Sequence, residues 1–136
     1  MKAKIIVKSI IFNRKLNRIL IIQRSKSDPI GADTWENAGG NVEYGETPEQ
    51  AVRREIREET GITEIRTERV AYVTLVDGND PYLIIAYLCE SLTENVALSG
   101  EHQAFLWADK NECINMLPAE IIKDFNKNKI FEYLGM

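Results

Sequence analysis

The sequence predicts a mixed α/β fold, a sandwich in which β-strands precede and follow one central helix. Two β-rich runs stand before the helix and two after it: Lys4–Phe12, Arg18–Arg24, Glu64–Val76 and Tyr82–Ser91. The helix, which begins near Pro48, carries its own start and stop signals. Strands on both sides of a helix favour helices layered on a mixed sheet, and 136 residues make one ordinary domain, residues 1–136.

The two N-terminal runs are rich in Ile and Val, which is typical of strands. The polar segment Asn13–Asn17 forms the turn that joins them. Ser25–Asp33 contains Pro29 and Gly31 and is therefore predicted to be a loop.

The central helix has the clearest boundaries in the chain. Thr47 suits the N-cap, Pro48 the first helical position, and Gln50 completes a capping box with Thr47. Gly61 supplies the C-terminal stop. A narrow apolar stripe for packing comes from two residues four positions apart, Val52 and Ile56.

The second half of the chain predicts an antiparallel strand pair and then helices. Asp77–Pro81 is a strong turn signal between the two later β-rich runs. Gln103–Ala108 is predicted to be another short strand, and Asn111–Met116 and Pro118–Tyr133 one or two helices. The apolar residues expected to face inward from these helices are Ile121, Ile122, Phe125 and Ile130.

Composition and charge narrow the class of function. The chain is 44% hydrophobic and 28% charged, with a net charge of -4, which argues against a nucleic-acid or membrane-surface binder. Residues 1–18 have a basic start and an apolar run, but Lys8 interrupts the run and no cleavage site follows, so a strand is favoured over a signal peptide. Cys89 and Cys113 have no metal-ligand spacing and are expected to be buried free thiols. We therefore expect a cytoplasmic protein.

Three carboxylates crowd one face of the central helix. Glu55, Glu58 and Glu59 fall within an arc of roughly 100° at the helical repeat of about 100° per residue. Such charges repel each other unless a cation lies between them. A hard divalent cation such as Mg²⁺, which prefers oxygen ligands, is the obvious candidate.

The alternative is a solvated helical face of alternating charges, in which Arg54 pairs with Glu58. A helix exposed only for solubility does not need the three glycines of the preceding loop: Gly39, Gly40 and Gly45. Glycine lets backbone approach a ligand closely, so loop carbonyls and helix carboxylates can converge on one cation. The flanking loop thus favours a metal site.

The same segment resembles the Nudix box at every defined position: Gly40-x5-Glu46-x7-Arg54-Glu55-Ile56-x-Glu58-Glu59-x-Gly61-Ile62. Trp35–Gly40 is similar to the W-x-x-P-G-G lead-in of that family, with Ala38 where many members have proline. Glu101-His102 followed by Trp107 is similar to the E-H…W segment of many members. The resemblance implies an α/β/α sandwich with a mixed sheet, which hydrolyses a nucleoside diphosphate linked to another group with the help of Mg²⁺ or Mn²⁺.

The resemblance also implies site residues. Glu55 and Glu59 are expected to be the principal metal ligands, Glu58 a ligand or the residue that acts on the attacking water, and the Gly39 carbonyl an additional ligand. Two residues are expected to support catalysis by holding the loop and orienting the carboxylates, Glu46 and Arg54.

The general base is left open, because family members use either a box glutamate or a glutamate on a later loop, here Glu101. His102 is expected to make a structural hydrogen bond. Trp35 and Trp107 are core or rim aromatics, with a base-pocket role as the alternative for Trp35. Glu43 either faces water or points toward the phosphate site.

The leading function is hydrolysis of a nucleoside triphosphate to a monophosphate, since the segment GETPEQAVRRE resembles the housecleaning triphosphate hydrolases of the family. An ADP-ribose or nucleotide-sugar pyrophosphatase is the alternative, although Asp77–Asp80 lacks the proline or tyrosine that marks some of those subfamilies. A non-catalytic nucleotide-binding module is the alternative of another class, and it is disfavoured because all three box glutamates are present. The expected partner is a small nucleotide, with neither nucleic acid nor membrane, and a homodimer is common among similar proteins.

Overall fold

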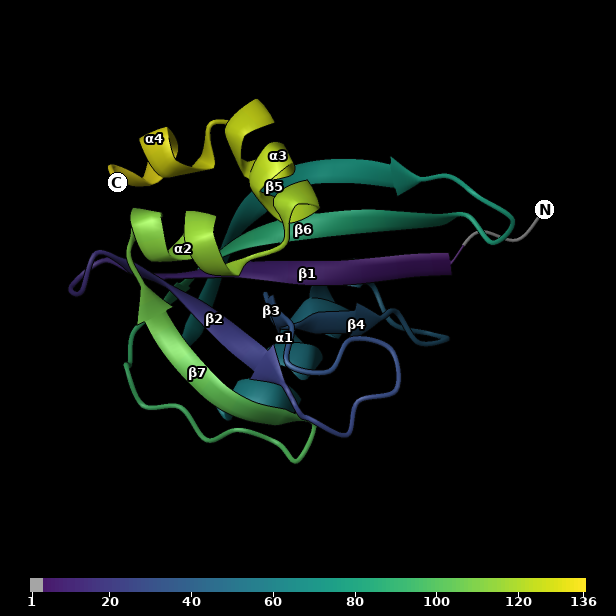
Figure 1. Cartoon of the computed structure of the whole chain (residues 1–136), viewed down its shortest axis with the longest axis horizontal. Coiled ribbons are helices and arrows are strands. Elements are labelled where there is room, and N and C mark those ends of the chain that lie inside the picture. Colours follow the sequence, from purple (N-terminus) through teal and green to yellow (C-terminus); the bar gives the residue numbers. More distant parts are fainter. Residues whose placement is uncertain (1–3) are drawn as a thin grey trace.

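The structure, a computed structural model, describes residues 4–136; the basic start of the chain, residues 1–3, lies outside the described residues. Within the described part, seven strands form one mixed sheet: β1 (Lys4–Asn13), β2 (Arg18–Arg24), β3 (Trp35–Glu36), β4 (Gly39–Asn41), β5 (Ile65–Val76), β6 (Tyr82–Ser91) and β7 (His102–Ala108). The described helices are α1 (Pro48–Thr60), α2 (Lys110–Met116), α3 (Ala119–Lys127) and α4 (Ile130–Leu134). Figure 1 shows the long β1, β6 and β5 side by side, with β2 and β7 diverging from them.

The sheet runs in the order β3-β2-β1-β6-β5, with β4 added to β1 and β7 added to β2. One edge of β1 pairs in parallel with β6. Its other edge pairs with two different strands: with β4 near Val7 and with β2 at Phe12. Because β2 and β4 meet β1 at opposite ends, the sheet opens between them, and this is where the candidate site lies.

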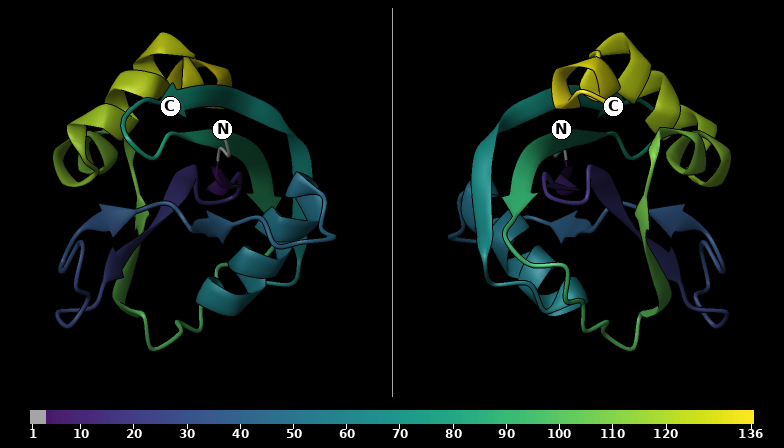
Figure 2. Two further views of the ribbon diagram at one scale, coloured as in Figure 1. Left: turned by 90° about the vertical axis from the view of Figure 1, so that its right-hand side faces the viewer. Right: turned by 90° about the vertical axis from the view of Figure 1, so that its left-hand side faces the viewer.

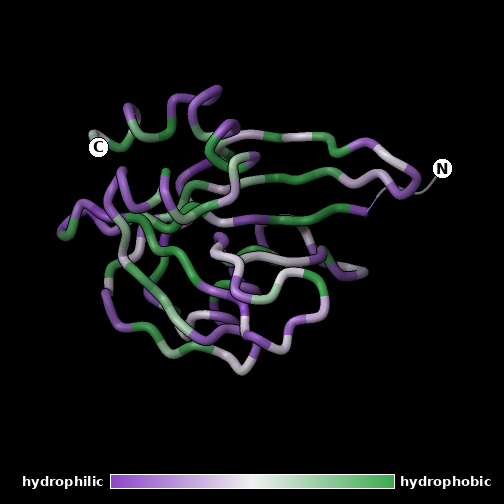
Figure 3. The backbone as a smooth tube through the Cα atoms, in the orientation of Figure 1, coloured by the Kyte–Doolittle hydropathy of each residue, from purple (hydrophilic) through white to green (hydrophobic). Residues whose placement is uncertain are grey.

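Alternating side chains of the central strands contribute to two hydrophobic cores, one on each face of the sheet. Ile10 and Phe12 of β1 face the core that α2, α3 and α4 cover, whereas Val7 and Ile11 face the core that α1 covers. Figure 2 shows α1 and the C-terminal helices on opposite sides of the curved sheet, and Figure 3 shows hydrophobic residues concentrated on the strands. The predicted α/β/α sandwich with a mixed sheet is thus confirmed.

The predicted boundaries of α1 are also confirmed. Thr47 Oγ1 accepts a hydrogen bond from the Gln50 N–H at 3.1 Å, and Gln50 Oε1 accepts one from the Thr47 N–H at 2.9 Å. Gly61 ends the helix in the left-handed region with φ 71°. Val52 and Ile56 are fully buried, as their spacing predicts.

Two predictions about elements were wrong in part. The glycine loop contains a strand, β4, in which Gly39 pairs with Lys8. Glycine permits this close pairing, because a Cβ on Gly39 would lie 2.1 Å from the Val7 carbonyl oxygen. The C-terminal segment forms three helices rather than one or two, since Lys129 adopts a left-handed φ of 53° that separates α3 from α4.

Other predictions hold in the described residues. β5 and β6 pair antiparallel on either side of Asp77–Pro81. Phe125 and Ile130 are fully buried, and Cys89 and Cys113 are buried free thiols. None of the helices in residues 4–136 is long and apolar enough to cross a membrane.

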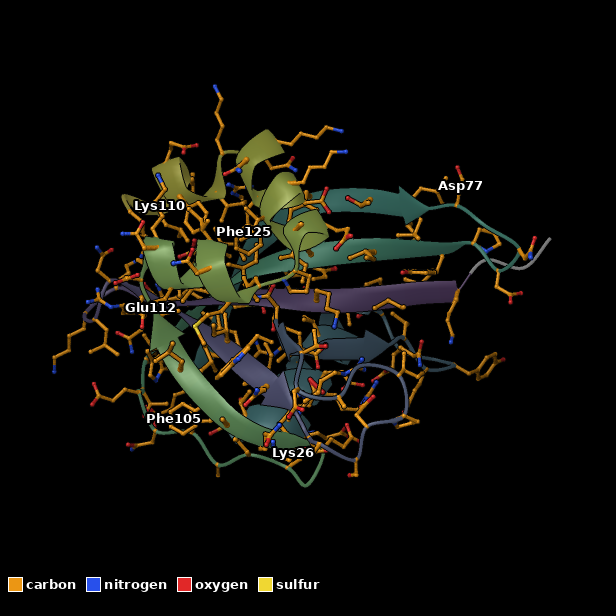
Figure 4. The ribbon with its side chains drawn as sticks, viewed as in Figure 1. Lys26, Asp77, Phe105, Lys110, Glu112 and Phe125 are labelled. Atoms are coloured by element: carbon orange, nitrogen blue, oxygen red, sulfur yellow. The ribbon has the colours of Figure 1, made fainter. Side chains whose placement is uncertain are left out.

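Phe125→Leu is expected to lower the free energy of unfolding by about 1.5 kcal/mol, because the smaller side chain leaves a gap in the core. The Phe125 ring is fully buried and meets Phe131 edge-on, with ring centroids 5.5 Å apart. Phe105→Leu is the matched control, since Phe105 is 42% exposed on β7 and lies away from Phe125 and the C-terminal helices in Figure 4. Urea denaturation should show a loss within about 0.5 kcal/mol for the control. Equal losses in both variants would contradict this view of the core.

Candidate metal and catalytic site

A cleft of about 1100 Å³ opens where β2 and β4 part along β1. Its lining includes the backbone of Gly39 and Gly40 and side chains from β1, β2 and β6. Together with Asp28 and Asp80, six glutamates line the cleft, from β3, from the loop after β4, from α1 and from the turn before β7: Glu36, Glu43, Glu55, Glu58, Glu59 and Glu101. Residues far apart in the sequence therefore converge on one acidic cleft.

Arg54 ties the loop after β4 to α1. Its Nε donates to Glu46 Oε2 at 2.7 Å and its Nη2 donates to the Asn41 carbonyl at 3.0 Å. The Nη1 atom donates to Glu55 at 2.9 Å and to Glu58 at 3.2 Å. The hydrogen bond from Arg54 lowers the pKa of Glu46, and the pKa of Arg54 is raised mainly by its bond to Glu46. One guanidinium thus holds both the loop and two carboxylates of the helix.

Glu59 is the most deeply buried of the box carboxylates, with 7% of its surface exposed. Its Oε1 accepts a hydrogen bond from the Gly39 N–H at 2.8 Å. Burial raises the pKa of Glu59 to about 7, although the Gly39 N–H and the charges of His102 and Lys8 act in the opposite direction. Within residues 4–136 no lysine or arginine forms an ion pair with it. A buried carboxylate of this kind is stabilised in its charged form when a cation binds.

Glu55 and Glu58 differ in exposure. Burial raises the pKa of Glu55, and the neighbouring charges of Glu58 and Glu101 raise it further against the effect of Arg54. The side chain of Glu58 is 56% exposed. A Cβ on Gly40 would lie 2.5 Å from Glu55 Oε1, so only glycine lets this carboxylate lie against the loop.

The donor set fits a hard divalent cation. Carboxylate oxygens line the cleft, and burial raises the pKa values of Glu55 and Glu59, so a bound cation would stabilise their charged forms. In the described residues, however, no three such side chains are already gathered as ligands. Arg54 holds Glu55 and Glu58, and the Gly39 contact with Glu59 is through its N–H. Binding of a cation would therefore require these side chains to turn from their present partners.

Glu101 stands on a turn that is fixed by backbone bonds. Its carbonyl accepts from the Ser25 N–H at 3.0 Å, and its own N–H donates to Ser99 Oγ at 3.3 Å. The Ser99 N–H in turn donates to the Glu59 carbonyl at 3.3 Å, so the turn is attached to the end of α1. The structural hydrogen bond predicted for His102 is confirmed, since its Nε2 lies 2.9 Å from Glu36 Oε2.

The remaining sequence-predicted residues have clear positions. Trp35 packs against the core under the C-terminal helices and does not line the cleft, whereas Trp107 packs near the core under α1. The alternative role of Trp35 in a base pocket is therefore not supported. Glu43 lines the cleft, with an oxygen 3.7 Å from Arg54 Nη1.

Six charged residues of the cleft were not predicted as site residues: Lys4, Lys8, Arg24, Asp28, Glu36 and Asp80. Lys8 interrupts the apolar run of β1, and this break in the pattern is a signal for a charge that faces a site rather than a core. Glu36 carries no comparable signal, because its role depends on partners from other strands.

A family model of the NUDIX domain matches residues 3–128. The chain belongs to the NUDIX family. The nucleoside triphosphatase NudI of Escherichia coli is 34% identical over 92 residues, which cover 60% of this chain and 65% of NudI. The match therefore spans less than two thirds of that relative.

Solved NUDIX structures share the fold. The MutT protein of Methanosarcina mazei Go1 is 27% identical, with a TM-score of 0.79 over 96% of this chain and 95% of that one. A Caenorhabditis elegans Ap4A hydrolase has a TM-score of 0.80 over 96% of this chain and 98% of its own, and at 23% identity it supports the fold alone. NUDIX hydrolases act on pyrophosphate bonds of small nucleotides and generally use a divalent metal ion.

Proposed function

We propose that the protein is a Mg²⁺-dependent pyrophosphohydrolase that converts a nucleoside triphosphate to a monophosphate. The observation that carries this proposal is the convergence of Glu55, Glu58, Glu59 and Glu101 on one cleft beside Gly39 and Gly40. The 34% identity to a nucleoside triphosphatase supports the substrate class. Mn²⁺ is an alternative ion of the same chemistry.

In the proposed mechanism, Glu55, Glu59 and Glu58 would hold the ion, with the Gly39 carbonyl as a further candidate ligand. The bound ion would neutralise phosphate oxygens and increase the acidity of nearby water. Glu101 takes a proton from the attacking water, whose oxygen forms a bond to phosphorus while the bond from phosphorus to the bridging oxygen breaks. Arg54 holds Glu55 and Glu58 beside the site through the hydrogen bonds that it donates to them, from which the two carboxylates would turn when the ion binds.

A substrate screen tests the proposal. Nucleoside triphosphates, their oxidised forms, ADP-ribose and nucleotide sugars are each incubated with the protein and Mg²⁺, and the products are separated by ion-exchange chromatography. We expect a nucleoside monophosphate and inorganic pyrophosphate from a triphosphate, and no turnover when a chelator is present.

Two outcomes would overturn the proposal. Two monophosphates from ADP-ribose or a nucleotide sugar, without turnover of triphosphates, would identify the alternative pyrophosphatase. Nucleotide binding without turnover of any compound would identify a non-catalytic module.

We further infer that the whole chain forms one domain that acts in the cytoplasm on a free nucleotide, without nucleic acid or membrane. The net charge of -4 and the two buried free thiols support this inference. Light scattering coupled to size-exclusion chromatography distinguishes a monomer from a homodimer.

A further inference from the structure

The Glu36 carboxylate on β3 contacts nitrogen atoms of side chains from three other strands. It lies 3.1 Å from Lys8 Nζ on β1, 3.4 Å from Arg24 Nε on β2 and 2.9 Å from His102 Nε2 on β7. The side chain is 13% exposed. Burial by itself raises the pKa of Glu36, but these partners outweigh it and the pKa is lowered, so the group stays charged.

On one side, Glu36 controls the residue next to Glu101. The His102 side chain is 2% exposed, and its Nδ1 has no hydrogen-bond partner among the described residues. Among residues 4–136, Glu36 is therefore the one hydrogen-bond partner of the buried ring. The ring follows Glu101 directly, on the turn that the Ser99 N–H attaches to α1.

On the other side, the same cluster holds the backbone that leads to Gly39. Lys8 Nζ, which pairs with Glu36, also donates to the Asn37 carbonyl at 3.4 Å. Ser9 Oγ donates to the Ala38 carbonyl at 2.7 Å. The next residue, Gly39, donates its N–H to Glu59. Glu36 thus joins the segment that contacts Glu59 to the turn that carries Glu101.

We propose that Glu36 is a positioning residue, which acts through His102 to set the place of the Glu101 carboxylate relative to Glu55 and Glu59. This inference rests on the proposed hydrolytic function. A displacement of about 1 Å at a catalytic group lowers the rate by up to about 10²-fold. Because Glu36 joins the two sides of the cleft, we expect its loss to lower turnover more than substrate binding.

The first test separates turnover from binding. Glu36→Ala and His102→Ala are each expected to lower kcat about tenfold, with KM changed less than about twofold. His102→Gln is expected to keep most of the wild-type kcat, unlike His102→Ala. The amide nitrogen of the glutamine can donate a hydrogen bond to Glu36 from nearly the position that His102 Nε2 occupies. A raised KM with unchanged kcat would show direct contact with substrate and overturn the proposal.

The second test asks whether Glu36 acts through Glu101. In a Glu101→Gln background, Glu36→Ala should cause little further loss of kcat, since the group that it positions is already absent. The same tenfold loss in both backgrounds would overturn the proposal.

Glu90→Ala is the matched control. Glu90 is also a buried carboxylate with two arginine partners, Arg14 and Arg66, but it lies outside the cleft. We expect it to lower the melting temperature and leave kcat unchanged. A fall in kcat equal to that of Glu36→Ala would show that lost stability alone explains both.

A measurement without substrate keeps this inference separate from the proposed function. Amide hydrogen exchange at residues 99–102 should become faster in Glu36→Ala than in the wild-type protein and stay near wild type in His102→Gln. If Glu36→Ala does not fold, Glu36→Gln, which keeps a hydrogen-bond acceptor but loses the ion pairs, takes its place in every assay. Unchanged exchange would overturn the positioning role, whereas an inactive wild-type protein with the expected exchange would contradict only the proposed reaction.

Discussion

Glu59→Gln is expected to abolish hydrolysis and at the same time to stabilise the metal-free protein at pH 8. Glutamine keeps an oxygen that can accept the Gly39 N–H, which Glu59 Oε1 now accepts at 2.8 Å. It removes the negative charge that the proposed metal site requires, so kcat/KM should fall at least about 10³-fold. One substitution should therefore change activity and stability in opposite directions.

The sign of the stability effect follows from the pKa of Glu59, which burial raises from 4.5 to about 7. A carboxyl group with a raised folded-state pKa stabilises the fold fully below its unfolded pKa, and this contribution is lost as the pH rises through the folded pKa. The difference between 4.5 and about 7 corresponds to about 3 kcal/mol, or roughly 10 °C in Tm for a domain of this size. At pH 8 the charged Glu59 lowers the free energy of unfolding of the metal-free wild-type protein by this amount, whereas the uncharged glutamine of the variant does not.

Thermal denaturation from pH 5 to pH 8, with a chelator present, measures this effect. The difference in Tm between Glu59→Gln and the wild-type protein should grow as the pH rises through about 7. Mg²⁺ should then raise the wild-type Tm more at pH 8 than at pH 6, because protons compete for Glu59, and should leave the variant unchanged. A pH-independent difference would mean that Glu59 is not the buried charge described here.

Local signals in the sequence were sufficient for α1 and its carboxylates. The capping box of Thr47 and Gln50 and the stop at Gly61 act within one turn of the helix, so they need no tertiary context. The helical repeat then placed Glu55, Glu58 and Glu59 on the side that proved to line the cleft. The limits of α1 and the face that carries its carboxylates depend on residues close together in the chain, so they can be read from the sequence.

Features set by distant partners were missed. β4 exists because Gly39 pairs with Lys8, although glycine disfavours strands on its own. The Glu36 cluster depends on contacts 28 residues away with Lys8 and 66 residues away with His102. The break at Lys129 lacks the glycine or proline that usually marks one. In each case the deciding contact or backbone conformation is a property of the folded chain.

Glu101→Gln and Glu58→Gln are expected to reduce hydrolysis for different reasons. Glu58 accepts a hydrogen bond from Arg54 at 3.2 Å, so one of its carboxylate oxygens already has a protein donor. Glu101 has no ion-pair partner among residues 4–136, and its turn is fixed to Ser25 and to α1. We therefore expect Glu101 to be the general base and Glu58 to be a metal ligand.

Metal titrations of kcat separate these roles. Glu58→Gln should lose hydrolysis at about 1 mM Mg²⁺ and recover part of it as the concentration rises, because a lost ligand weakens metal affinity by about 10- to 100-fold. Glu101→Gln should bind Mg²⁺ like the wild-type protein but remain about 10²- to 10⁴-fold slower at saturation, which is the usual contribution of a general base. The opposite pattern would assign the base to Glu58 on the helix, and Glu36 would then have no catalytic group to position through His102.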